Sequence, residues 1–448
     1  MTIDFLRVVF AAHAGDPAIV WREREWTYGW LLSAVDRWRE WLAGRPGFAP
    51  GQVVSLEADF SPNAVALLLA LVEGGAVVVP MTDSVEAKKP RFREIAEVES
   101  VVALDASDQP RFESTGAVVR HPLIRGLVEL GRPGLVLFSS GSTGESKAAL
   151  HDFVPLLDKF RVPRHRKRMI TFLLFDHIGG INTLLYALAN GGCAVTVADR
   201  GADPVLAAIE RWRVEVLPAS PTFLHLVLLS HAWERHDLSS LELVTYGTEV
   251  MPEATLRRLA EVLPGVRLQQ TYGLSELGIL RSKSRDDRST WVRLGGEGYE
   301  LRVRDGLLEV KAHSAMLGYL NAPSPFTGDG WFATGDAVEQ DGEWLRILGR
   351  ASDLINVGGE KVYPAEVEGV LAQLEGVLDV VVTGEPNAIT GRMVVARVRL
   401  ATGEDLASFR VRMKQHCRLR LRPFQIPQKV VLVDSDSHGP RFKKMRSQ

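Results

Sequence analysis

The chain has 448 residues, of which 46% are hydrophobic and 24% are charged, and its formal net charge is −2. This composition is that of an ordinary globular protein, long enough for two or three lobes and a sizeable core. A near-neutral chain offers no overall electrostatic case for binding nucleic acid or an anionic membrane surface.

The two cysteines, Cys193 and Cys417, lie far apart and lack the spacing of metal ligands. Such sparse usage argues against a disulfide framework and fits a reducing compartment, so we expect a cytoplasmic protein. At the start of the chain, residues 1–15 include Asp4 and have no basic head before an apolar core. They predict an amphipathic helix, not an export signal.

Residues 64–80 form the most apolar stretch of the chain. Glu73 and two glycines interrupt it below the length that spans a bilayer. We therefore predict a buried helix, a turn and a strand here, and no membrane span anywhere.

Short β-rich runs then alternate with helical patterns, which favours a layered α/β fold. Helical patterns such as residues 203–213 separate the predicted strands. These buried strands are residues 134–140, 193–199, 214–220 and 241–247.

After about residue 290 the sequence pattern changes from alternating strands and helices to hairpins. Hairpins are predicted around Asp305-Gly306 and Asp341-Gly342, which places a small β subdomain at about residues 290–349. From residue 350 a loop, a helix over 365–376, two strands and a further helix indicate a compact α+β unit. We predict a boundary near residues 349–352, with a large domain over 1–349 and a mobile α+β domain over 350–448.

A loop rich in glycine and hydroxyl groups follows the predicted strand at residues 134–140. Glycines let backbone N–H groups approach an anion, hydroxyls add donors, and the lysine adds charge. A Walker loop is excluded because Ser146 and Ala148 replace its second glycine and its magnesium-binding hydroxyl. A polar surface turn is the alternative interpretation. The candidate anion-binding residues are Ser139, Ser140, Gly141, Ser142, Thr143, Gly144 and Lys147.

This loop resembles the phosphate loop of the adenylate-forming superfamily, which includes acyl-CoA synthetases, aryl-acid ligases and peptide-synthetase adenylation domains. Ser146 and Ala148 depart from the proline and glycine usual in that family. Other family motifs follow in family order. They are YGLSE at 272–276, MLGYLNAP at 316–323, GWFATGD at 330–336 and GRASDLINVGGEKVYPAEVE at 349–368.

The resemblance implies specific roles. Tyr272, Gly273 and Ser275 would meet adenine and phosphate, and Glu276 would help hold Mg²⁺, since an acid beside phosphates needs a cation. Asp336 would accept hydrogen bonds from the ribose hydroxyls, although Thr-Gly-Asp is also simply a good turn. Arg350 would contact the ribose, Ser352 would sit at the hinge, and Gly358 and Gly359 would pass a pantetheine arm.

A second catalytic lysine is implied near the C-terminus, where the tail reads GPRFKKMRSQ. The spacing to Arg446 selects Lys443, whereas the apolar Met445 favours Lys444. A frayed basic tail is the alternative interpretation.

Residues 173–188 resemble the segment that forms the acyl pocket. His177 would act as its gate and Gly180 would continue the motif, while Asp176 would contact a substrate amine or merely cap a helix. Tyr246, Gly247 and Thr248 would wall the other side. This pattern favours an aromatic or medium-size acyl acid over an amino acid.

The implied reaction uses ATP and Mg²⁺ to convert a carboxylic acid into acyl-AMP. The acyl group then passes to the thiol of coenzyme A or of a carrier-protein phosphopantetheine. Residues 401–448 carry 11 Lys or Arg against 4 Asp or Glu, a net charge of +7, and residues 161–168 form a second basic run. An acidic acyl-carrier protein could dock on such charge, or the charge could be a solvated face. Transfer to an amine, and a catalytically weakened acyl-binding relative, remain the rival functions.

Overall fold

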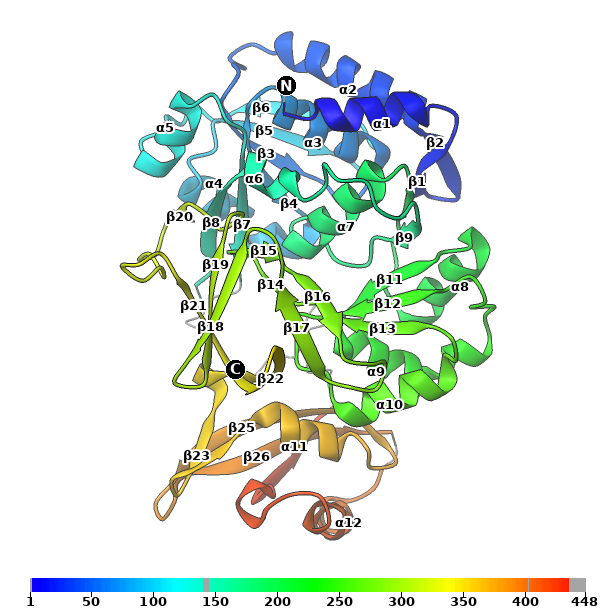
Figure 1. The fold of residues 1–448 in the computed structure, drawn as a ribbon, viewed down its shortest axis with the longest axis vertical. Coiled ribbons are helices and arrows are strands. Elements are labelled where there is room, and N and C mark those ends of the chain that lie inside the picture. Colours follow the sequence, from blue (N-terminus) through cyan, green and yellow to red (C-terminus); the bar gives the residue numbers. More distant parts are fainter. Residues whose placement is uncertain (1, 140–144, 402, 435–448) are drawn as a thin grey trace.

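The structure is a computed structural model, and it describes residues 2–139, 145–401 and 403–434. Layers of helices and sheets make up the large N-terminal region, and a smaller sheet lies at the opposite end of the long axis from α1 and α2 (Figure 1). The predicted mixed α/β class is confirmed. No helix within the described ranges combines the length and the apolar character needed to cross a membrane.

The first sheet holds the strand that leads into the glycine and hydroxyl loop. Its central strands β7, β4, β3 and β5 run parallel, and β8, β20 and β6 are antiparallel additions. In spatial order the strands are β20 (Gly318–Tyr319), β8 (Lys147–Asp152), β7 (Gly134–Ser139), β4 (Val77–Met81), β3 (Val53–Glu57), β5 (Ser100–Leu104) and β6 (Pro110–Ser114). The near-continuous apolar sequences of β3 and β4 match strands buried on both faces.

The second sheet is parallel except for its edge strand β2. Its strands in spatial order are β13 (Arg267–Gln270), β12 (Leu243–Tyr246), β11 (Val216–Ala219), β9 (Arg168–Ile170), β10 (Cys193–Val195), β1 (Pro17–Trp21) and β2 (Arg24–Thr27). The strand predicted at 193–199 is therefore shorter than expected.

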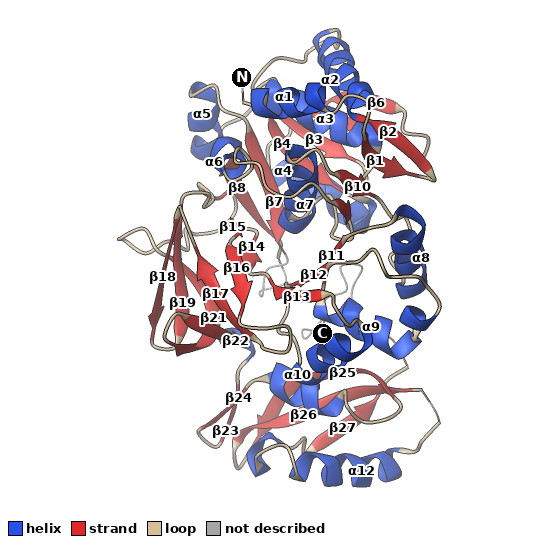
Figure 2. Cartoon of the chain, turned by 45° about the vertical axis from the view of Figure 1, so that its right-hand side comes forward, coloured by secondary structure: helices blue, strands red, loops and turns tan. Residues whose placement is uncertain are grey.

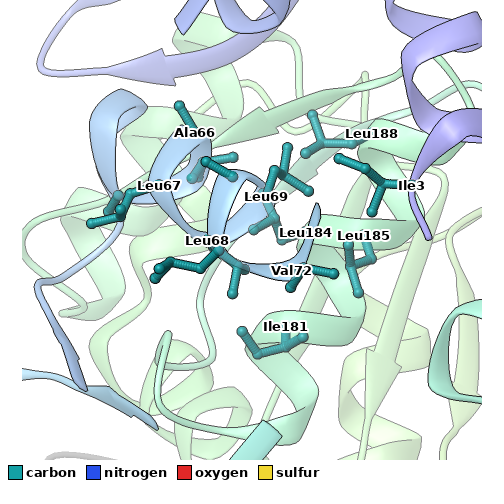
Figure 3. Close-up of a cluster of buried hydrophobic side chains, with 14 of the residues drawn as sticks. Ile3, Ala66, Leu67, Leu68, Leu69, Val72, Ile181, Leu184, Leu185 and Leu188 are labelled. Atoms are coloured by element: carbon teal, nitrogen blue, oxygen red, sulfur yellow. The ribbon is translucent and has the colours of Figure 1, made fainter. Parts of the chain in front are cut away.

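Helices cover both sheets (Figure 2). Those of the N-terminal region are α1 (Asp4–Ala12), α2 (Tyr28–Ala43), α3 (Pro62–Glu73), α4 (Lys89–Ile95), α5 (Pro122–Glu129), α6 (Phe153–Asp158), α7 (Ile178–Ala189), α8 (Ala202–Trp212), α9 (Pro221–Ser230) and α10 (Glu253–Val262). Helix α3 is apolar all round and is buried, and its Leu69 and Val72 lie near Leu184 and Leu185 of α7 (Figure 3). The predicted helix, turn and strand at 64–80 are confirmed.

An antiparallel sheet follows, and it begins at Arg281, earlier than the predicted 290. Its strands in spatial order are β16 (Arg281–Ser284), β17 (Trp291–Gly295), β22 (Trp344–Arg350), β21 (Phe332–Asp341), β19 (Leu307–Ala312) and β18 (Tyr299–Arg304). Both predicted hairpins are present, with Asp305 in the left-handed conformation that such a turn requires. A short hairpin of β14 (Gly273–Leu274) and β15 (Gly278–Ile279) precedes this sheet.

The last sheet has the order β24, β23, β26, β25, and β27 pairs with β26. Its strands are β23 (Ile355–Val357), β24 (Glu360–Val362), β25 (Val377–Asn387), β26 (Gly391–Leu400) and β27 (Lys429–Leu432). Helix α11 (Pro364–Leu371) buries Val367 and Leu371 against it, and helix α12 (Leu406–Arg418) buries Phe409 and Met413. Helix α11 ends before the predicted residue 376. The predicted domain boundary near 349–352 lies between this sheet and the preceding one and stays a prediction.

Candidate active site

Four motif segments lie just after the carboxyl ends of parallel strands. The glycine and hydroxyl loop follows β7, the Asp176 segment follows β9, Gly247 follows β12, and the Tyr272 segment follows β13. Ligands of open α/β sheets bind at such edges. Residues Ser140, Gly141, Ser142, Thr143, Gly144, Lys443 and Lys444 lie outside the described residues. Ser139 pairs with Lys147 across the strands that flank the loop, so Lys147 has a defined place at its end.

Lys147, Glu276 and Tyr319 form a compact group. The Tyr319 hydroxyl donates to Glu276 Oε1 at 2.6 Å, and Lys147 Nζ lies 5.3 Å from the centre of the Tyr319 ring. Burial and the neighbouring carboxylate raise the pKa of the Tyr319 phenol, so it remains a neutral donor. A cation and an anion therefore flank one aromatic side chain.

Tyr272, Asp336 and Arg350 form a second group. The Tyr272 hydroxyl donates to Asp336 Oδ2 at 2.6 Å, and Arg350 Nε lies 2.9 Å from Asp336 Oδ1. Arg350 also donates to the carbonyl of Thr334. Burial raises the pKa of Tyr272, and Asp336 is itself buried. The motifs at 272–276, 330–336 and 349–350 thus meet in space.

The YGLSE segment at 272–276 is held in place by contacts to its backbone. His151 is fully buried, its Nε2 lies 2.6 Å from the carbonyl of Ser275, and burial lowers the pKa of the imidazole. A Cβ on Gly273 would lie 2.7 Å from the carbonyl of Gly278, so the β14–β15 hairpin requires glycine there. Gly273 therefore has a packing role as well as its predicted place beside the nucleotide.

At the acyl segment, His177 is the N-cap of α7, since its Nδ1 accepts a hydrogen bond from the Gly179 N–H at 3.1 Å. The alternative that Asp176 caps this helix is wrong. Asp176 is buried, and its Oδ2 accepts a hydrogen bond from Thr82 Oγ1 at 3.0 Å. A Cβ on Gly180 would lie 2.0 Å from the carbonyl of Leu174, so close packing requires this glycine.

Three residues, Tyr246, Gly247 and Thr248, are predicted to form the other wall of the acyl pocket, and one of them belongs to the hydrophobic core. Tyr246 is 1% exposed and packs within the apolar core of the second sheet. Gly247 lies against Thr271, and Thr248 is exposed in the left-handed conformation. Of these three residues, Thr248 presents its side chain to solvent.

The predicted hinge and pantetheine residues are exposed. Ser352 lies in a short 3₁₀ turn, η3 (Ala351–Asp353), and its hydroxyl donates to Asp353. Gly358 and Gly359 form the exposed turn between β23 and β24. This hairpin lies at the edge of the last sheet, away from β14 and β15 (Figure 2).

The basic run at 161–168 lies on the opposite edge of the second sheet, at the amino ends of its strands. Four of its five lysines and arginines form ion pairs: Arg161 with Asp158, Arg166 with Asp16, Lys167 with Glu215 and Glu242, and Arg168 with Glu25. Three of them line a polar cavity of about 520 Å³ together with Arg213, Glu215 and Glu242. This pairing favours the interpretation of the run as a solvated face.

Sequence reasoning assigned no role to Tyr319, His151 or Asn321. The motif MLGYLNAP indicates the family, but its residue types do not show which side chain Tyr319 contacts. Its partner Glu276 lies 43 residues away. His151 and Asn321 follow no spacing rule, so their contacts become visible only in the folded chain.

Two models of AMP-binding enzymes match this chain. The AMP-binding enzyme family model matches residues 6–124 and 83–306, and the model of the AMP-binding enzyme C-terminal domain matches residues 366–443. Indoleacetate–CoA ligase of Aromatoleum aromaticum is 28% identical over 94% of this chain and 92% of its own. Triostin synthetase I of Streptomyces triostinicus is 30% identical over 98% of this chain and 92% of its own.

The fold also matches a solved structure. The anthranilate CoA ligase AuaEII, in complex with anthranoyl-AMP, superimposes with a TM-score of 0.83 at 22% identity, covering 99% of this chain and 95% of that one. The family models span more than half of the chain, and their order along it is that of the motifs. The chain therefore belongs to the AMP-binding enzymes, the adenylate-forming superfamily.

Proposed function

We propose that this protein is an acid–thiol ligase that activates a carboxylic acid with ATP as acyl-AMP and then transfers the acyl group to a thiol. One observation carries the proposal: the segment at 272–276 connects two charged groups built from parts of the chain far apart in sequence. The Tyr319 hydroxyl donates to Glu276 and its ring lies near Lys147, while the Tyr272 hydroxyl donates to Asp336. Core packing accounts for the position of the two tyrosine rings but not for the carboxylate partners of their hydroxyls, which are expected of a nucleotide site.

In the first half-reaction the acid's carboxylate oxygen attacks the α-phosphorus of ATP, and the bond to pyrophosphate breaks. A free carboxylate is a poor acylating agent, and AMP as leaving group removes that barrier. Catalysis of such a step rests on positioning and charge neutralisation. Lys147 neutralises phosphate charge, and Asp336 accepts the ribose hydroxyls in exchange for its present partners. Lys443 or Lys444 would approach the α-phosphate.

Magnesium fits this site. Among the described residues no cluster of three or more His, Cys, Asp or Glu could hold a metal ion. Mg²⁺ nevertheless binds commonly through one or two carboxylates plus substrate phosphates. Glu276 is the carboxylate that would hold it here, beside Lys147. The ion would supply charge neutralisation on the phosphates.

An aromatic or medium-size acyl acid is the proposed substrate. His177, Ile178 and Gly180 match the acyl and aryl ligases, and the relative named above is an indoleacetate–CoA ligase. The rival is an amino acid bound through Asp176. That carboxylate is buried and accepts a hydrogen bond from Thr82, so Asp176 also has a structural contact within the folded chain.

The proposed acceptor is coenzyme A, with a carrier-protein phosphopantetheine and an amine as alternatives. Gly358 and Gly359 would reach the site when the C-terminal domain turns about Ser352. The exposure of both segments is compatible with such a motion. The Triostin synthetase relative keeps the amino-acid alternative open.

A panel of aryl, acyl and amino acids, assayed by pyrophosphate release with ATP and Mg²⁺, tests the proposal. We expect release that depends on an aromatic or medium-size acid, and a mass increase of coenzyme A by the acyl group. Release with amino acids alone would favour the rival. No acid-dependent release at all would exclude adenylation.

A further inference from the structure

We infer that Tyr319 is a positioning residue that holds the Glu276 carboxylate in place and keeps it apart from the Lys147 ammonium. This inference rests on the proposed function, in which Glu276 meets the cation and Lys147 meets the phosphates. It assigns a role to a side chain that acts through two other residues.

The backbone of Tyr319 is fixed on the strand that begins at Lys147. Strand β20 pairs with β8 in antiparallel register, with Tyr319 opposite Ala149. Hydrogen bonds from Leu317 N–H to the Leu150 carbonyl (2.7 Å) and from Leu320 N–H to the Ala148 carbonyl (2.9 Å) extend this pairing. Tyr319 as a whole is 9% exposed and belongs to the apolar core of the antiparallel sheet, so packing sets the orientation of its ring.

Residues 316–321 also form hydrogen bonds with the backbone of Glu276 and with the residues on either side of Lys147. The Met316 N–H donates to the carbonyl of Glu276 at 2.7 Å. The Asn321 side chain brackets Lys147, since it accepts from the Ala148 N–H at 2.9 Å and donates to the Ser146 carbonyl at 3.0 Å. Residues 316–321 therefore set the separation of Lys147 and Glu276.

Tyr319 then acts on the two side chains. Its hydroxyl makes a charge-assisted hydrogen bond to the carboxylate, and its ring faces the ammonium within the range of a cation–π contact. Among the ion pairs of the described residues, none includes Lys147 or Glu276. A lysine and a glutamate that both contact one side chain would gain from pairing with each other if they could meet.

A direct Lys147–Glu276 pair would neutralise both groups before the nucleotide arrives. Separate contacts with Tyr319 hold each charge in its own orientation, which is the preorganisation that a phosphate site needs. The hydroxyl and the ring therefore have separable effects. The hydroxyl serves Glu276, and the ring serves Lys147.

Calorimetry of ATP binding to the full-length protein, with and without Mg²⁺, separates these effects. We expect Tyr319→Phe to leave Mg²⁺-free ATP binding unchanged and to lose about tenfold of the affinity that Mg²⁺ adds, because a hydrogen bond to a charged group is lost. We expect Tyr319→Leu also to weaken Mg²⁺-free binding about threefold, since Lys147 can then pair with Glu276. The Mg²⁺ concentration for half-maximal pyrophosphate release should rise in both variants.

Tyr28→Phe is the matched control, because Tyr28 is fully buried in the N-terminal core and its hydroxyl donates to the Gly192 carbonyl at 2.7 Å. It should lower the melting temperature without changing the effect of Mg²⁺. In a Glu276→Gln background, Tyr319→Phe should have no further effect on Mg²⁺-dependent binding.

Wild-type Mg²⁺ dependence in Tyr319→Phe would overturn the inference. An equal loss in Tyr28→Phe, or full additivity with Glu276→Gln, would overturn it as well. If the wild-type protein binds no ATP and no acid elicits pyrophosphate, the proposed function fails instead. The two failures are therefore distinguishable.

Discussion

Two charged regions of this molecule differ in how their charges are satisfied. In the basic run at 161–168, Arg161, Arg166, Lys167 and Arg168 each have a carboxylate partner. In the candidate site, no ion pair among the described residues includes Lys147 or Glu276, and each contacts the side chain of Tyr319. The basic run is the more conspicuous feature of the sequence. Partner geometry, not local charge density, distinguishes a site from a solvated face.

The largest expected effect is at Lys147. Lys147→Ala should lower acid-dependent pyrophosphate release about 100- to 1,000-fold, because the site loses the positive charge that neutralises the phosphates during the reaction. Steady-state pyrophosphate assays measure this loss. A reduction below about threefold would mean that Lys147, like the cations of the basic run, is not part of the active site.

Asp336→Asn should act on nucleotide binding. An amide offers the two ribose hydroxyls one acceptor oxygen where the carboxylate offers two, so we expect the KM for ATP to rise about tenfold with a smaller change in kcat. ATP titrations at saturating acid provide the measurement. An unchanged KM would mean that the Asp336 group serves folding and not the nucleotide.

Lys167→Ala tests the basic run by the opposite criterion. The variant loses ion pairs to Glu215 and Glu242, and the free energy of unfolding should fall by about 1 kcal/mol. Urea denaturation measures this change, and pyrophosphate release should stay at the wild-type rate. A large loss of activity without a loss of stability would make the run part of the site.

The smallest expected effect is on the pH dependence of stability. It concerns Lys159, which lies in the sequence between Lys147 and the basic run. Its Nζ donates to the Ile279 carbonyl at 3.1 Å, and burial lowers the pKa of the ammonium to about 7. The unfolded lysine has an ordinary pKa near 10.4, so the unfolded chain binds the extra proton above pH 7. The free energy of unfolding should therefore rise as pH increases from about 7 to about 9.

Because part of the Lys159 surface remains accessible, we expect this rise to be under about 1 kcal/mol. Denaturation curves of Lys159→Met should lack it, whereas Lys361→Met, which changes an exposed lysine of β24, should retain it. A rise of equal size in Lys159→Met would assign the pH dependence to other groups.

Much of the fold could be predicted from local pattern. The hairpins at Asp305-Gly306 and Asp341-Gly342 follow from turn chemistry, and the buried helix α3 follows from a run of apolar residues too short for a membrane. The start of the β subdomain was missed because β16, with the sequence RSKS, has no apolar alternation. Its strand character comes from pairing with β17.

The site divides in the same way. Motif order alone indicated Lys147, Tyr272, Glu276, Asp336 and Arg350, and the structure joins them into two groups. The capping role at α7 went to His177 and not to Asp176, because the Asp176 side chain is held by Thr82, 94 residues away. No local rule contains such a partner.

The sequence by itself determined the α/β class, the order of the motifs and the residue types of a phosphate site, because these depend on short-range spacing and chemistry. Only the tertiary structure decided which charges are paired and which are kept apart. Tyr319 shows the reason: its effect depends on two side chains that reach it from different strands and loops. A contact of that kind exists only once the sheets have packed.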